Sequence, residues 1–82
     1  MEDEIFELMN HISSRVSKNY DEDLFASDVL DSLGMARLIV ELEEYFQIEI
    51  PIEDIAPENF VTVCQIAQLV SNIRGKNHGS EN

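Results

Sequence analysis

The sequence predicts an all-α fold, a bundle of three long helices plus one short helix, with a long loop between helices one and two. Apolar residues recur with helical spacing in three segments, 3–17, 31–46 and 62–74. Capping residues precede the second and third of these segments. Because 82 residues are enough for only one small core, we expect a single domain over residues 1–74, followed by a disordered polar tail over 75–82.

The first long helix is predicted over residues 3–17. Its apolar positions fall on one face, and acidic residues cluster at its start, where the helix dipole favours them. This face comprises Ile5, Leu8, Met9, Ile12 and Val16. Residues 18–30 follow neither a helical nor a strand period, so we expect a long loop held to the core by Leu24, Phe25, Val29 and Leu30.

The second long helix is predicted from about Asp31 to Phe46, with Asp31 capping free backbone amides. Its core face is expected to hold Met35, Leu38, Ile39, Leu42, Tyr45 and Phe46. A second apolar stripe, Leu33, Ala36 and Val40, lies opposite, next to Ser32 and flanked by Arg37 and Glu44. The stripe is either covered by the long loop or exposed to bind a partner.

Beyond residue 46 the helical pattern is interrupted. Pro51 restricts Ile50 to extended geometry, which predicts a loop with buried apolar residues, or alternatively a two-residue strand. A short helical turn is expected at Pro57. Thr62 and Gln65 form a capping-box pattern for the last helix, which is predicted to end near Arg74 and Gly75. The predicted core is Ile5, Leu8, Ile12, Val16, Leu38, Leu42, Phe46, Ile66, Val70 and Ile73.

The chain is strongly acidic, with a net charge of -12. Twelve of its 17 acidic residues lie between residues 21 and 58, where Arg37 is the one basic residue. Such a field repels nucleic acid and anionic lipid and favours basic protein surfaces, although solubility alone would also explain it. No apolar run is long enough to span a bilayer, no signal pattern opens the chain, and Cys64 is the one cysteine. We therefore expect a cytoplasmic monomer.

Catalytic and metal-binding roles find little support. A nucleophilic serine needs a positioned base, and the two histidines are His11, within the first predicted helix, and His78, in the tail. A calcium loop over residues 21–32 would place Ala26 where glycine is required and Ser32 where glutamate is required. One cysteine and two distant histidines cannot supply the four ligands of a zinc site. We expect neither an enzyme nor a metal site.

Ser32 instead places a hydroxyl at a helix N-terminus, where backbone amides favour a phosphate group. The motif "DSLG" followed by "MARLIVELEEYFQIEIP" resembles the D-S-L signature of acyl and peptidyl carrier proteins. The resemblance extends over roughly residues 4–74 and implies the carrier fold of three long helices and one short helix. The alternative is that Ser32 merely accompanies Asp31 at the cap.

The resemblance implies that a separate phosphopantetheinyl transferase attaches 4′-phosphopantetheine from coenzyme A to Ser32, with Asp31 and Leu33 completing the motif. The terminal thiol of that group would carry acyl or aminoacyl thioesters between loading and acceptor enzymes with basic docking surfaces. The partner-recognition surface is then expected to comprise Leu33, Ala36, Arg37, Val40, Glu43 and Glu44. The competing interpretation is a small acidic adaptor or inhibitor that uses the same surface without a prosthetic group.

Two residues depart from the pattern of bacterial fatty-acid carriers. Those proteins usually place an acidic residue directly after D-S-L and another three residues later, whereas this chain has Gly34 and Arg37. The segment "MARLIVEL" is closer to peptidyl carriers, and "VLDSLG" with "LIVELE" also resembles the D-alanyl carriers of lipoteichoic acid synthesis. These departures weaken the case for a housekeeping fatty-acid carrier, and the sequence leaves the cargo open among fatty acyl, polyketide, aminoacyl and D-alanyl groups.

Overall fold

The computed structural model describes residues 1–16 and 19–79 and shows an all-α chain, as the sequence predicts. The long helices are α1 (Glu2–Ile12), α2 (Ser32–Phe46) and α3 (Val63–Gly79). Two short 3-10 helices, η1 (Ile52–Asp54) and η2 (Pro57–Asn59), lie between α2 and α3, and the described residues form no strand. None of the described helices is long and apolar enough to cross a membrane.

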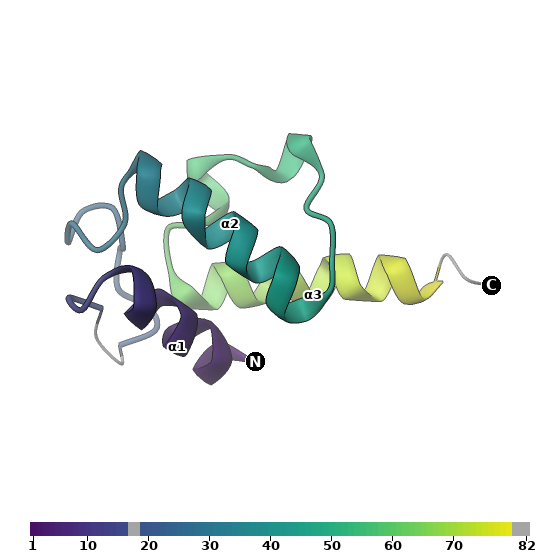
Figure 1. Ribbon diagram of the computed structural model, residues 1–82, viewed down its shortest axis with the longest axis horizontal. Coiled ribbons are helices and arrows are strands. Elements are labelled where there is room, and N and C mark those ends of the chain that lie inside the picture. Colours follow the sequence, from purple (N-terminus) through teal and green to yellow (C-terminus); the bar gives the residue numbers. More distant parts are fainter. Residues whose placement is uncertain (17–18, 80–82) are drawn as a thin grey trace.

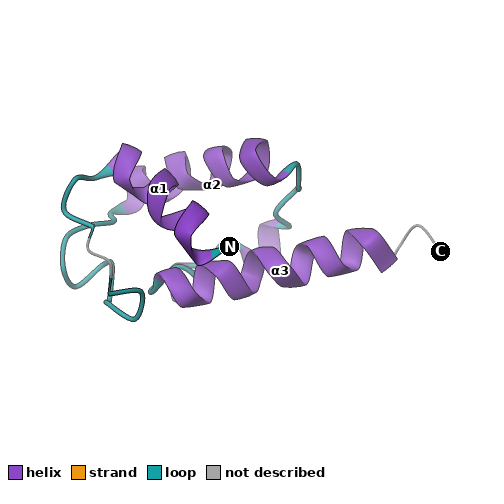
Figure 2. Cartoon of the chain, turned by 90° about the horizontal axis from the view of Figure 1, so that it is seen from below, coloured by secondary structure: helices purple, strands orange, loops and turns teal. Residues whose placement is uncertain are grey.

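The three long helices form a small bundle in which α1 packs against both α2 and α3 (Figure 1). The connection between α1 and α2 lies at the end of the bundle where α2 begins, and the C-terminal part of α3 extends beyond the other helices (Figures 1 and 2). The start of α2 is therefore at one end of the molecule, beside the long loop.

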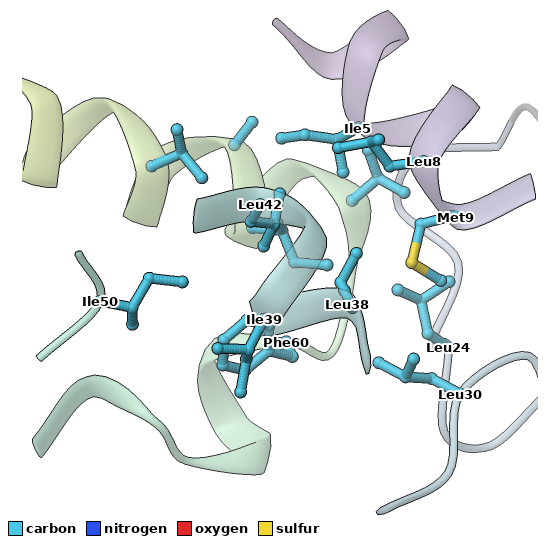
Figure 3. Packing of buried hydrophobic residues seen from close by; sticks show 14 of the residues in the cluster. Ile5, Leu8, Met9, Leu24, Leu30, Leu38, Ile39, Leu42, Ile50 and Phe60 are labelled. Atoms are coloured by element: carbon cyan, nitrogen blue, oxygen red, sulfur yellow. The ribbon is translucent and has the colours of Figure 1, made fainter. Parts of the chain in front are cut away.

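The core lies between the helices and includes anchors from the long loop (Figure 3). Leu24 and Leu30 are buried against α1 and α2, as their apolar character in the loop predicts. The predicted core is confirmed at eight positions, which are Ile5, Leu8, Val16, Leu38, Leu42, Ile66, Val70 and Ile73. Ile12 and Phe46 are only half-buried at its edge.

The C-terminal ends predicted for α1 and α3 are both wrong. α1 ends at Ile12 instead of residue 17, because Ser13 turns to extended geometry and its hydroxyl accepts the Arg15 N–H at 3.3 Å. α3 continues to Gly79, past the end predicted near Arg74 and Gly75. Gly75 does not adopt the positive φ of a helix-terminating glycine, so the helix is not interrupted there. Residues 80–82 of the predicted tail lie outside the described residues.

Two apolar positions also differ from expectation. Tyr45 does not join the core but is 53% exposed, with its hydroxyl donating to the Glu4 carboxylate at 3.1 Å. Past α2, Ile50 is buried as predicted, whereas Ile52 is 84% exposed on η1. The helical turn expected at Pro57 is confirmed as η2.

Candidate functional site at the start of α2

Asp31 fixes the point at which α2 begins. Its backbone is extended, its carboxylate accepts the Gly34 N–H at 2.7 Å, and its carbonyl oxygen accepts the Met35 N–H at 2.8 Å. This is the side-chain cap that the sequence predicts. One of the first-turn amides is satisfied by the protein itself, while those of Ser32 and Leu33 have no helical carbonyl partner.

Ser32 is the first residue of α2 and is exposed. Its hydroxyl forms no hydrogen bond with any other part of the chain that the structure describes. Asp31, not Ser32, provides the cap, so the serine is not needed to start the helix. An exposed hydroxyl beside unpaired amides at a helix N-terminus suits attachment of a phosphate ester, whose negative charge the helix dipole stabilises.

The surroundings of Ser32 contain no catalytic arrangement. His11 lies exposed on α1, and no hydrogen bond links it to Ser32. Over residues 1–16 and 19–79 there is also no cluster of three or more histidine, cysteine or acidic side chains able to hold a metal ion.

The apolar stripe of α2 is exposed and is not covered by the long loop. Leu33 is 81% exposed and Val40 52%, and Ala36 and Arg37 are exposed beside them. Ile52 on η1 is a further exposed aliphatic side chain, which the periodicity of α2 could not reveal. Neighbouring exposed aliphatic side chains are typical of a surface that binds partners.

The two glutamates predicted for partner recognition have different surroundings. The Glu43 carboxylate accepts the Ile50 N–H at 2.9 Å, so it holds the chain that leaves α2. Glu44 is exposed and available on the surface. Arg37 forms an exposed pair with Glu41, with 3.3 Å between Nε and Oε2.

A hollow of about 320 Å³ lies beside Ser32, between the end of α1, the long loop and the first turns of α2. We call it the Ser32 hollow. Its walls include Ile12, Arg15, Asp28, Leu33, Gly34 and Arg37. No sequence pattern places Arg15 and Asp28 here, because their approach depends on where α1 ends and on the left-handed backbone of Asp28, with φ of 62°.

Gly34 allows the elements around this hollow to lie close together. A Cβ at this position would be 3.2 Å from the Asp31 carboxylate oxygen and 3.5 Å from a methyl group of Ile12. An added Cβ would therefore crowd the capping carboxylate, whereas its contact with Ile12 would be an ordinary one. Close packing around the cap gives a structural reason for the glycine, which has low helix propensity.

A second polar cluster joins the N-terminus of α1 to the loop and α3. The Cys64 thiol donates to the Glu2 carboxylate at 2.9 Å, and this bond together with Asp21 raises the pKa of Cys64 to about 12. The Tyr20 hydroxyl donates to Asp3, which raises the pKa of Tyr20 to about 12. Cys64 stays protonated at neutral pH, and a protonated thiol is a poor nucleophile.

Comparison with known proteins places the chain in a family. Residues 5–70 match the family described as "Phosphopantetheine attachment site". The chain is 41% identical over 75 residues to the D-alanyl carrier protein of Streptococcus pyogenes serotype M5 (strain Manfredo), covering 90% of this chain and 95% of that protein. The D-alanyl carrier protein of S. pyogenes serotype M1 shows the same identity and coverage.

Proposed function

The chain belongs to the phosphopantetheine attachment-site family, and from this premise we propose that Ser32 is the residue that bears the prosthetic group. The family membership makes the protein a carrier of thioesters, including aminoacyl thioesters, and not an enzyme. It also makes 4′-phosphopantetheine its covalent cofactor, attached to a serine. Its partners are a phosphopantetheinyl transferase and the enzymes that load and accept the cargo.

The observation that carries the proposal is the exposed Ser32 hydroxyl at a helix start that Asp31 already caps. The surroundings fit a phosphodiester, because two unpaired amides and the positive end of α2 lie beside the hydroxyl. Attachment would form a bond between Ser32 Oγ and a phosphorus of coenzyme A. The diphosphate bond breaks, the phosphorylated adenosine half leaves, and the hydroxyl proton passes to a base of the transferase.

When bound, the group supplies a terminal thiol on which cargo is held as a thioester. This chain's own residues keep the attachment point exposed and the helix in place. They also keep the protein's one cysteine protonated, so that Cys64 does not compete with the cofactor thiol for the cargo.

D-Alanine is the cargo that we propose. Support comes from the 41% identity to carriers of that name, which extends over 95% of their length. Gly34 and Arg37, which stand where fatty-acid carriers usually have acidic residues, point in the same direction. Incubating the holo protein with ATP and the D-alanine-activating enzyme of such a Streptococcus should add the mass of an alanyl group with D-alanine and much less with L-alanine.

We further propose that partner enzymes dock on the exposed stripe of α2, with Leu33, Ala36 and Val40 as the apolar contacts and Arg37 and Glu44 at the edge. The exposure of these residues beside Ser32 supports this surface. The net charge of -12 supports partners with basic surfaces and a monomeric carrier, since like charges repel. A cytoplasmic location is supported by the free Cys64 and by the intracellular supply of coenzyme A.

The attachment is tested by intact mass after incubation with coenzyme A and a broad phosphopantetheinyl transferase. Wild type should gain the phosphopantetheine mass, and Ser32→Ala should not, while both keep the helical circular dichroism spectrum. Ser27→Ala is the matched control, because Ser27 is the nearest other serine in the loop and is half-buried. If Ser32→Ala still gained the phosphopantetheine mass, the group would be attached elsewhere. The same conclusion would follow if Ser27→Ala alone failed to gain it.

A further inference from the structure

We propose that the Ser32 hollow is an intramolecular subsite for the phosphate end of the prosthetic arm, with Arg15 and Arg37 as its cationic walls. The inference rests on the proposed attachment at Ser32 and adds a resting place for the arm between visits to partner enzymes. The neighbours of Ser32 on both sides, Asp31 and Leu33, line this hollow. Ser32 itself does not line the hollow, so an arm attached there starts beside the hollow and between two of its lining residues.

The distribution of charge opposes a phosphate less here than on the acidic surface around the hollow. Two of the chain's three arginines, Arg15 and Arg37, line this one hollow of a protein that carries a net charge of -12. The acidic residues on its walls are Asp28 and Asp31, and the Asp31 carboxylate already accepts the Gly34 N–H at 2.7 Å. The hollow is therefore locally balanced in charge, unlike the acidic surface around it.

Both guanidinium groups are available to an incoming anion. Arg15 has no ion-pair partner among the side chains described for residues 1–16 and 19–75. Arg37 pairs with Glu41 at 3.3 Å, but its side chain is 65% exposed, and an exposed pair of this kind contributes little. Turning Arg37 from Glu41 toward a phosphodiester therefore costs little, and guanidinium groups bind phosphate oxygens well.

The size of the hollow and the covalent tether set what it can hold. Its volume is about 320 Å³, at the lower end of the range of roughly 300–1,000 Å³ for ligand pockets. The hollow therefore suits one end of the prosthetic arm and not the whole arm. The segment next to the phosphate carries two methyl groups, and Ile12, Val29 and Leu33 offer aliphatic walls for them. Because a short tether gives an effective concentration on the order of millimolar, even a weak site would be occupied.

Concavity alone does not identify this subsite. Another hollow of about the same volume is lined by Asp54, Asn59 and residues of α3. It contains no arginine and no residue of α2. The combination of two arginines, aliphatic walls and the neighbours of the attachment serine is found at the Ser32 hollow.

The test uses the full-length holo protein, loaded to completion and checked by intact mass. In wild type, nuclear Overhauser effects should connect the two methyl groups of the arm to the methyl groups of Ile12 and Leu33. The phosphorus resonance should shift when salt is raised to 1 M, where charges are screened within about 3 Å. In the double variant Arg15→Gln, Arg37→Gln, we expect these effects and the salt-dependent shift to be lost.

Arg74→Gln is the control for loss of an arginine elsewhere, because it removes one positive charge from α3 and Arg74 does not line the hollow. It should leave both signals unchanged. Absence of the Overhauser effects in loaded wild type, or their persistence in the double variant, would overturn the subsite and leave the attachment intact. Failure of wild type to load at Ser32 would instead overturn the proposed function itself.

Discussion

At the scale of single residues, the site separates two tasks between neighbours. Asp31 caps α2 through its bond to the Gly34 N–H, and Ser32 presents a hydroxyl that the fold does not use. Because the hydroxyl has no internal partner, modifying it breaks no hydrogen bond within the described chain. A bulky group can be added there at little cost to stability.

This separation predicts opposite effects for two adjacent substitutions. Asp31→Ala should lower the free energy of unfolding by about 0.5–2 kcal/mol, the usual cost of losing a helix cap. Ser32→Ala should change it by less than about 0.5 kcal/mol, as expected for an exposed position. Denaturant titrations of both variants would measure this. A larger loss for Ser32→Ala than for Asp31→Ala would show that the serine is structural.

A second residue-scale prediction concerns the exposed stripe. Leu33→Asp and Val40→Asp should each slow loading by the transferase about tenfold or more, because covering one aliphatic side chain contributes about 1.5–3 kcal/mol. Gln68→Asp, at an exposed position of α3, is the control and should load normally. The rate is read from the increase in holo mass with time. If both stripe variants were loaded at the wild-type rate, the proposed docking surface would be contradicted.

At the scale of elements, α2 was the helix best predicted from the sequence. Its start follows from a local signal, the Asp31 side chain, and its core face follows from the 3.6-residue period. The exposed stripe follows from the same geometry, since Leu33 and Val40 fall opposite Leu38 and Leu42. The residues of α2 and its cap were therefore sufficient to predict where this helix begins and which face it buries.

The ends of α1 and α3 were predicted less well, because competing local signals decide them. α1 ends at Ser13, whose hydroxyl accepts the Arg15 N–H. Val16 lies beyond the helix and is buried nevertheless. Gly75 was expected to end α3, but its backbone stays helical. The Ser32 hollow could not be predicted either, since it depends on the early end of α1, which brings Arg15 to α2, and on the left-handed backbone of Asp28.

The helical phase of α2 and α3 makes a prediction about stability. Leu42 and Ile66 are fully buried in the core, so truncating either to alanine should cost about 2–5 kcal/mol. Val40→Ala, on the exposed side of α2, is the matched control and should cost less than about 1 kcal/mol. Thermal or denaturant unfolding would measure the difference. Equal effects at positions 40 and 42 would contradict the packing of α2.

At the scale of the whole molecule, the polar cluster of Cys64, Glu2, Tyr20 and Asp3 connects α1 with the loop and α3. Each donor in it must be protonated to make its bond. Tyr20 and Cys64 both have pKa values raised to about 12, from ordinary values of 10.0 and 9.0. Their contribution to stability is therefore complete below pH 9 and is lost as pH rises toward 12.

We accordingly predict an alkaline loss of stability that depends on these two residues. The denaturant midpoint of wild type should fall between pH 9 and pH 12, because the unfolded chain releases protons that the folded chain retains. In Tyr20→Phe with Cys64→Ser, neither side chain ionises in this range, so the midpoint should depend less on pH. If the midpoint of the double variant fell with pH as steeply as that of wild type, other groups would cause the alkaline loss of stability.

The central claim for the whole molecule is that it carries its cargo on a cofactor attached to Ser32. It is tested most directly by locating the phosphopantetheine within the holo protein by tandem mass spectrometry of its proteolytic peptides. The account predicts that the modification maps to Ser32 alone, in the peptide that contains the start of α2. A modification located on Ser27, or on any other serine, would contradict it.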